Sequence, residues 1–339
     1  MWNFLNQIKL IRYLVVWKVN SSFVKLPPSF SPELSRVLGT IISKRLSTRE
    51  AKPWHKGLIS GGNEILESEE QGSKTETLWP IESVLLVYPA KLSYGTGEFI
   101  IWELKLLGEQ ADHGFFLEVI LPAIEEASYT SDRQWGYRNG LWGHFDIQSV
   151  YVARGYNWQP LVNNGRLDLR CQVSPEQWAE GLSFTSPIRL QQAFRGLTWL
   201  TPFDIREICL TKCFLRGCHK KSTISLQGIL ELLILRLNYL IFGKNYTTHL
   251  NPKENCFDIN LFSPSDQKAL QAAINDTKNI PTLSEEITYF SNKKLTGERI
   301  GKQTFTSNIP SSVIPYLELA SILHVGRKTH FGCGTFYLN

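Results

Sequence analysis

The chain opens with a strand pattern, a double proline and a helix start in direct succession. Residues 8–20 alternate with a two-residue period, which predicts a partly buried β-strand. Leu26-Pro27-Pro28 ends that strand, because proline cannot donate to a sheet ladder. Ser31-Pro32-Glu33 then provides a helix N-cap, a proline at the first helical position and an acid in the first turn. The chain therefore begins with a βα unit.

The rest of the first half continues the alternation of strands and helices. Strands are predicted at 84–88, 98–106 and 145–152, and a helix at 115–127. The polar segment 47–78, with two adjacent glycines and several acids, is predicted to be a long loop. The order βα, ββ, αβ is typical of a ferredoxin-like domain.

A second unit of the same kind follows a connection at 155–182. Its pattern consists of a strand at 182–190, an amphipathic helix at 228–242 closed by Gly243, and strands from about residue 286 to the end. We therefore predict an α+β protein with two tandem ferredoxin-like (RRM-like) domains and a C-terminal glycine-rich loop. The predicted domains are residues 1–165 and 166–339.

The charge balance is only weakly basic. The 339 residues contain 36 Lys and Arg against 31 Asp and Glu, a formal net charge of +5, so affinity for a polyanion has to come from local clusters. The N-terminal segment is too interrupted by polar residues for a signal peptide, and the apolar run 228–242 is too short to span a bilayer. We expect a cytoplasmic protein with no membrane partner.

A glycine-rich segment near the C-terminus carries the clearest functional signal. Residues 326–334 read Gly-Arg-Lys-Thr-His-Phe-Gly-Cys-Gly. Glycine adopts positive φ freely, and successive amides in such a turn form an anion-binding concavity. Because Arg327 and Lys328 add positive charge, the segment predicts a binding site for a phosphate backbone. The alternative is a glycine-rich hairpin that ends a sheet.

The string from His324 to Phe336 resembles the C-terminal signature of the repeat-associated mysterious proteins (RAMPs). Within that superfamily it is most similar to the CRISPR endoribonucleases that cut precursor CRISPR RNA at its repeats. Arg36-Val37-Leu38-Gly39 and Ser186-Pro187-Ile188-Arg189 resemble two further elements of the family. His330 and Cys333 depart from the pattern, because small or apolar residues are usual there.

The resemblance implies metal-independent cleavage without a cofactor. In that reaction the 2′-hydroxyl of the RNA attacks the neighbouring phosphate and leaves a 2′,3′-cyclic phosphate. The expected partners are CRISPR repeat RNA, as precursor CRISPR RNA, and subunits of a CRISPR interference complex, in antiviral defence. The protein has to move protons and stabilise phosphate charge, which histidine and Lys or Arg can do.

His55 is the catalytic candidate, with Lys52 and Lys56 as cationic neighbours. Relatives that cut place a histidine in or just after the first helix. This chain has none between residues 31 and 46, and His55 is the nearest. The alternative is an ordinary surface histidine on a solvated loop. His324 is expected to end a strand and to order the glycine-rich loop through a hydrogen bond.

The predicted RNA-binding residues lie in the glycine-rich loop and in basic clusters of the second half. They are Gly326, Arg327, Lys328, His330, Gly332 and Gly334 in the loop, and Arg189, Arg206, Lys212, Arg216, Lys293 and Lys294 outside it. Lysine and arginine contacts to phosphate make such binding salt-sensitive. The basic runs can instead be solvated faces, and Arg189 can pair with an acid in the core.

Two other functions also fit the sequence. RAMP folds serve as non-cutting RNA-binding subunits of interference complexes, and the missing histidine on the first helix favours that role. Cys209, Cys213, Cys218 and His219 form the one cluster that would suit a metal-dependent nuclease or a zinc protein. Their spacing does not match the Cys-x-x-Cys pairs of structural zinc sites, so we expect no metal site.

Overall fold

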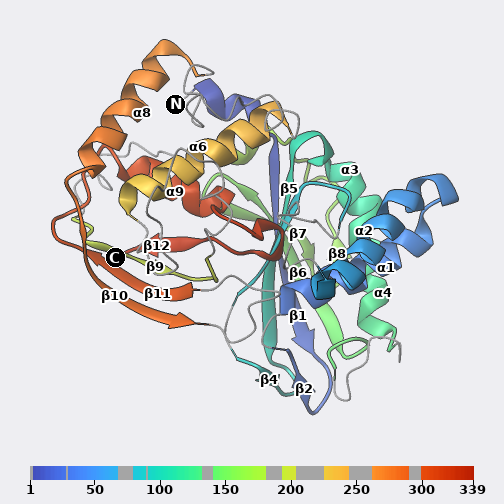
Figure 1. Cartoon of the computed structure of the whole chain (residues 1–339). Helices are drawn as coiled ribbons and strands as arrows, with labels where there is room; N and C mark the ends of the chain where they lie inside the picture. The colour runs from blue at the N-terminus through green and yellow to red at the C-terminus, as the bar shows by residue number, and fades with distance from the viewer. Residues whose placement is uncertain are drawn as a thin grey trace. The chain divides into compact units, whose positions relative to one another are not determined.

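The computed structural model describes residues 3–27, 30–67, 79–88, 91–131, 140–180, 193–203, 225–243, 262–289 and 299–339. Contacts divide the chain into two compact units (Figure 1). The first is Lys9–Gly181, and the second is Leu182–Asn339 together with Met1–Ile8. The boundary predicted between residues 165 and 166 falls earlier than this division, because the segment after it still packs on the first sheet through η5 (Gln177–Ala179).

The first unit is built on a six-stranded sheet in the order β3-β5-β1-β6-β7-β8. Its strands are β1 (Leu10–Val19), β3 (Ser83–Val87), β5 (Phe99–Leu107), β6 (Phe145–Arg154), β7 (Asn157–Asn163) and β8 (Arg166–Leu167). A separate two-stranded ladder joins β2 (Val24–Lys25) to β4 (Ser93–Tyr94). The pairs β1–β5, β1–β6 and β3–β5 are antiparallel. With helices after β1 and before β6, this is the βαββαβ order predicted from the sequence.

β7 and β8 correct the prediction of a plain connection at 155–182. Asn164 and Gly165 both have positive φ, as a tight hairpin turn requires. The turn pairs β7 with β8, and β7 adds to the sheet edge along β6. The connection therefore extends the first sheet.

The helices of the first unit lie together beside its sheet (Figure 1). They are α1 (Phe30–Arg45), α2 (Thr48–Glu67), η2 (Gly108–Gln110), α3 (His113–Phe115), the π-helical turn η3 (Phe116–Ile120) and α4 (Leu121–Tyr129). The rings of Tyr13 on β1 and Phe116 stack with their centroids 3.6 Å apart. Alternate residues of β1 therefore point into the helix layer.

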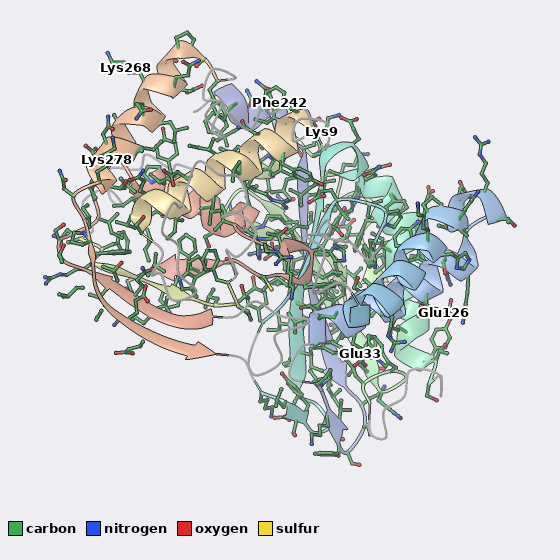
Figure 2. The ribbon with its side chains drawn as sticks, in the orientation of Figure 1. Lys9, Glu33, Glu126, Phe242, Lys268 and Lys278 are labelled. Carbon is green, nitrogen blue, oxygen red and sulfur yellow. The ribbon has the colours of Figure 1, made fainter. Side chains whose placement is uncertain are left out.

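Two carboxylates tie this helix layer together, and both are labelled in Figure 2. Glu33 on α1 accepts a hydrogen bond from Trp142 Nε1 at 2.7 Å. Glu126 on α4 accepts from Arg45 Nε at the end of α1, at 2.8 Å. Both ends of α1 are therefore anchored.

α2 corrects the prediction of a long loop over residues 47–78. Ser47 and Glu50 form a capping box: the Glu50 amide lies 3.5 Å from Ser47 Oγ, and Glu50 Oε2 accepts from the Ser47 amide at 3.3 Å. Ala51 and Trp54 are buried on the inner side of the helix. The prediction was wrong for 48–67, because the polar composition of the outer face hid a helix with a buried inner face.

Gly39, the last residue of the family-like Arg36–Gly39 element, explains how α2 packs against α1. A Cβ at this position would lie 3.1 Å from Trp79 Nε1 and 3.2 Å from a methyl of Leu58 on α2. Trp79 Nε1 in turn donates to the carbonyl of Ser35 at 2.8 Å. The glycine therefore allows a close helix contact that a larger residue would obstruct.

The second unit has the βαββαβ order with one further helix, α8, before its second described strand, and its sheet is arranged β10-β11-β9-β12. Its elements are η1 (Asn3–Gln7), β9 (Gly196–Trp199), α6 (Leu226–Phe242), α8 (Pro264–Thr277), β10 (Thr282–Tyr289), β11 (Arg299–Phe305), α9 (Ile314–Leu323), η8 (Thr329–Phe331) and β12 (Phe336–Leu338). Ser225 caps α6 by accepting from the Gly228 amide, and Gly243 ends it with φ 75°. The α+β prediction is confirmed. The predicted strand at 182–190 lies outside the described residues.

α9 is a third correction, because strands are predicted from about residue 286 to the end and His324 is expected to end one of them. Most side chains of α9 are buried, and Glu318 and Ser321 are its only charged or hydroxyl side chains apart from Tyr316, so its helical period is weak in the sequence. His324 therefore follows a helix rather than a strand. No helix in the described ranges is both long enough and apolar enough to cross a membrane.

Candidate nucleic-acid interface

The glycine-rich loop joins α9 to β12, the last strand of the second sheet. His324 opens it with φ 60° and is fully buried. Its Nδ1 lies 3.0 Å from the carbonyl oxygen of Cys333, and the Val325 amide donates to the Gly334 carbonyl at 3.0 Å. These two bonds join the first residues of the loop to its last. The predicted ordering role of His324 is confirmed.

Gly334 is the position at which this closure is tightest. Its φ is 85°, and a Cβ built on it would lie 1.8 Å from the Val325 carbonyl oxygen. Its amide also donates to the carbonyl of Pro202, in the segment after β9, at 3.0 Å. No side chain fits at this position without opening the loop.

The second half of the loop uses its amides internally. The amides of Phe331 and Gly332 donate to the carbonyls of Lys328 and Thr329, at 3.0 and 2.8 Å. The Thr335 amide donates to Thr201 Oγ1 at 3.1 Å. These amides are therefore used within the fold and are not directed at a ligand.

The first half of the loop, residues 326–329, carries the two predicted cations. Arg327 and Lys328 are both half-buried, and Lys328 adopts a left-handed conformation with φ 56°. Gly326 and Gly332, which lie on either side of them, also have positive φ, at 93° and 75°. The backbone thus turns sharply around the cationic pair.

His330 is packed within the loop. Only 5% of its surface is exposed, and its ring lies edge-on to Phe331 at 5.1 Å. This placement supports the loop structure. Contact between His330 and RNA stays a prediction.

Six of the predicted RNA-binding residues lie outside the described residues: Arg189, Arg206, Lys212, Arg216, Lys293 and Lys294. The same holds for the cluster Cys209, Cys213, Cys218 and His219. Within the described ranges, no three His, Cys, Asp or Glu side chains are grouped closely enough to hold a metal ion.

The three catalytic candidates lie on α2. Lys52, His55 and Lys56 are exposed, whereas Ala51 just before them and Trp54 between them are buried. Residues three and four positions apart in a helix are neighbours on its surface. The helix therefore brings Lys52, His55 and Lys56 together on one solvent-facing side. A loop would not have fixed that arrangement.

Arg49 extends this basic face and was missed in the sequence. It is exposed and lies three residues before Lys52 on the same helix. Hydrogen bonds from Ser47 lower the pKa of the intervening Glu50 and hold its carboxylate at the helix start. The Ser47-x-x-Glu50 capping box was the signal that would have found both the helix and this cation.

His113 in the same unit has a structural role. Its Nδ1 lies 2.9 Å from the Tyr13 hydroxyl, and its Nε2 lies 3.2 Å from the Cys171 carbonyl oxygen. A carbonyl can only accept, so Nε2 carries a proton. Burial lowers the pKa of His113, so Nδ1 of the neutral ring accepts from Tyr13.

A buried ion cluster joins β1 to β5. Glu103 is 1% exposed and accepts from Arg12 Nε at 2.6 Å and from the Tyr88 hydroxyl at 3.0 Å. Lys105 Nζ lies 3.9 Å from the same carboxylate. Burial alone would raise the pKa of Glu103, but the charges of Arg12 and Lys105 and the two hydrogen bonds hold it below its usual range.

Comparison with solved structures decides the fold. A chain of a partial Cas6-RT-Cas1–Cas2 complex is 10% identical, with a TM-score of 0.53, over 98% of this chain and 46% of its own length. A chain of a Cas6-RT-Cas1–Cas2 complex has the same identity and TM-score over 98% of this chain and 29% of its own. This chain shares their fold.

The two Cas6-containing chains are much longer than this one, which spans less than half the length of either. At 10% identity the likeness concerns the fold alone. No protein-family profile matches the chain, and no curated protein sequence matches it. The resemblance stated from the sequence is therefore confirmed at the level of the fold.

Proposed function

We propose that this protein is a CRISPR-associated endoribonuclease that binds repeat RNA and cleaves precursor CRISPR RNA. The observation that carries the proposal is the glycine-rich loop. Hydrogen bonds from His324 to Cys333 and from Val325 to Gly334 join its two ends, and its first half carries Arg327 and Lys328. The βαββαβ order of both units and the fold shared with Cas6-containing chains support it. Its partners would be repeat RNA and subunits of a CRISPR interference complex.

The loop is proposed to hold the RNA backbone. Gly326, Arg327 and Lys328 present a turned backbone and two cations to a phosphate, while Gly332 and Gly334 let the chain close behind them. Arg189, Arg206, Lys212, Arg216, Lys293 and Lys294 are proposed to extend this contact along the RNA. Binding should weaken as salt rises, because each neutralised phosphate releases counterions.

The basic face of α2 is proposed to carry the chemistry. His55 would take the proton from the 2′-hydroxyl, whose oxygen then forms a bond to the adjacent phosphorus. The bond from phosphorus to the 5′-oxygen breaks, that oxygen takes up a proton, and a 2′,3′-cyclic phosphate remains. Lys52 and Lys56 would stabilise the extra negative charge on the phosphate. This reaction needs no metal ion.

A non-cutting RNA-binding subunit is the second candidate function. It is favoured by one observation: α1 carries no histidine, and His55 lies farther along, on the exposed side of α2. In that case the loop would bind RNA as proposed, and the α2 cations would contact phosphate without moving protons.

Cleavage of repeat-containing RNA in EDTA tests the proposal. The wild-type protein should cut, and His55→Ala should lower the rate by about 10²–10⁴-fold. His144→Ala is the matched control, because His144 is also an exposed histidine of the first unit and should leave the rate unchanged.

Three outcomes would redirect the proposal. Binding without cleavage by the wild type would favour the non-cutting subunit. Loss of cleavage in EDTA would point to a metal-dependent nuclease. Unchanged cutting by His55→Ala would show that His55 is not the catalytic residue, and His330 would be the next residue to test.

A further inference from the structure

The face of the first sheet opposite helices α1 to α4 exposes an aromatic ring beside a lysine, on the two central strands of the ferredoxin-like core. Trp17 and Tyr13 of β1 point into the helix layer, where they contact Trp142 and Phe116. Because side chains alternate along a strand, Lys18 and Val16 point to the other face. Their register partners on β5, Phe99 and Ile101, lie on that same face.

These residues form what we call the Phe99 platform: Phe99, Ile101, Val16 and Lys18. Phe99 is 51% exposed and Ile101 is 39% exposed. Lys18, directly opposite Phe99, is also exposed. A solvent-facing strand surface is usually polar, so two large apolar side chains at alternate positions of a central strand form a distinct surface.

Two acids, Asp146 and Glu98, lie near the platform. Each interacts with a residue other than Lys18, so the Lys18 ammonium can contact a phosphate. Asp146 is opposite Lys18 on β6, and its Oδ1 accepts from the side-chain Nδ2 of Asn20 at 3.0 Å. Glu98 forms an ion pair with Lys91 and accepts from the Gly95 amide at 2.6 Å. In the described part of the chain, Lys18 forms no ion pair within 4 Å.

We propose that the Phe99 platform is a stacking site for an unpaired base of the RNA. A half-exposed aromatic ring offers its π-face to any base, and an adjacent lysine can contact the phosphate that joins that base to the next. In RRM domains, aromatics on a four-stranded sheet of this topology stack on single-stranded RNA. The inference rests on the proposed function for the identity of the ligand, and it adds a site for single-stranded RNA on the first unit, away from the glycine-rich loop in the sequence.

Binding of fluorescein-labelled oligouridine, which has no secondary structure, tests this site by fluorescence anisotropy. Phe99→Leu keeps an apolar side chain of similar bulk and removes the π-face. It should raise the dissociation constant by about 5- to 100-fold, whereas Phe99→Tyr should bind as the wild type does. Lys18→Ala should flatten the dependence of log affinity on log salt by about 0.7.

Tyr156→Ala is the matched control. Tyr156 is 44% exposed and lies in the turn between β6 and β7, at the opposite end of the sheet from Lys18. It should leave oligouridine affinity unchanged. Thermal unfolding of each variant would separate a lost ligand contact from a lost fold, and Phe99→Leu should keep the wild-type midpoint.

The outcomes separate this inference from the proposed function. Wild-type affinity in Phe99→Leu, or an equal loss in Tyr156→Ala, would overturn the platform even if cutting of repeat RNA depends on His55. A wild-type protein that does not bind oligouridine would overturn it as well. If the wild type never cuts repeat RNA but Phe99→Leu loses oligouridine affinity, the platform stands and the endonuclease proposal falls.

Discussion

The chain enters the last strand of each βαββαβ core, β6 in the first unit and β12 in the second, in the same way, and the two units differ in the residues just before that strand. In the first unit Gly143, with φ 78°, stands two residues before Phe145, which begins β6 and stacks on Trp17 of β1 at 4.1 Å. In the second, Gly334, with φ 85°, stands two residues before Phe336 at the start of β12. Phe336 contacts Trp199 of β9, the first strand of that unit, at 4.9 Å.

The difference lies in the connection that precedes each glycine. Residues 140–142 before Gly143 are Gly, Leu and Trp, whereas the loop before Gly334 contains Arg327, Lys328 and His330. The shared geometry shows that the positive-φ glycine and the buried phenylalanine serve the fold. The proposal that the second connection also binds RNA goes beyond this shared geometry and is tested below.

The largest expected effect is a loss of stability in the first unit, where the buried ion cluster around Glu103 lies. Glu103→Ala would leave Arg12 and Lys105 buried without their carboxylate, and should cost about 3–5 kcal/mol of unfolding free energy. Chemical denaturation would measure the loss, and the exposed pair of Lys9 and Glu109 offers a control, because Glu109→Ala should change little. Equal stability of Glu103→Ala and the wild type would show that this cluster does not stabilise the unit.

The second prediction compares the two glycines directly. Gly334→Ala places a Cβ 1.8 Å from the Val325 carbonyl oxygen, and Gly143→Ala places one 3.0 Å from the Ser131 amide nitrogen. Both have positive φ, so both should lower stability, Gly334→Ala by about 3 kcal/mol and Gly143→Ala by less. Only Gly334→Ala should also lose affinity for repeat RNA. A matching loss of affinity in Gly143→Ala would break the distinction between the two connections.

The third prediction concerns charge alone. Replacing Arg327 and Lys328 together by serine should weaken binding of repeat RNA, and thermal unfolding of the variant would measure any change in stability separately. If each cation neutralises one phosphate, the salt dependence should flatten by about 1.4 to 1.8 in log–log slope for the pair. The same slope in the variant and the wild type would mean that phosphate is held elsewhere.

Gly332, which lies in the loop after Arg327 and Lys328, allows a second test of the proposed phosphate site. Gly332→Asp adds a Cβ at φ 75° and a negative charge beside the proposed phosphate site. It should therefore lose RNA affinity, as measured by electrophoretic mobility shift. Unchanged binding would contradict the proposed role of the loop.

The smallest expected effect is a pH dependence confined to the first unit. Burial lowers the pKa of His113 below its ordinary value of about 6.5, so the unfolded chain binds this proton more readily than the folded one. The contribution to stability is therefore present above that ordinary value and is lost as pH falls through the lower folded pKa. His113→Gln should make unfolding less sensitive to pH in this range, which denaturation at several pH values would show. If the variant and the wild type show the same dependence of unfolding on pH, His113 does not contribute to that dependence.

Local patterns were sufficient for much of the first unit. The two-residue period of β1, the proline after it and the helix start of α1 are short-range signals, and the sheet places them as predicted. α2 was missed because Gly61-Gly62 and the acids nearby suggested a loop, although the capping box at Ser47 was present. α9 was mistaken for strand because most of its side chains are buried and apolar, and only Glu318 and Ser321 mark its less buried side.

The sequence by itself determined the βαββαβ order of the first unit, the position of the glycine-rich loop and the presence of cations within it. These depend on periodicity, caps and residue type, which act over a few residues. Only the tertiary structure decided which loop amides are used internally, that His330 is buried, and that Lys52, His55 and Lys56 share one face of a helix. Those facts depend on contacts between residues distant in the chain, such as Gly334 with Pro202 and Trp54 with Trp79, and no local pattern specifies them.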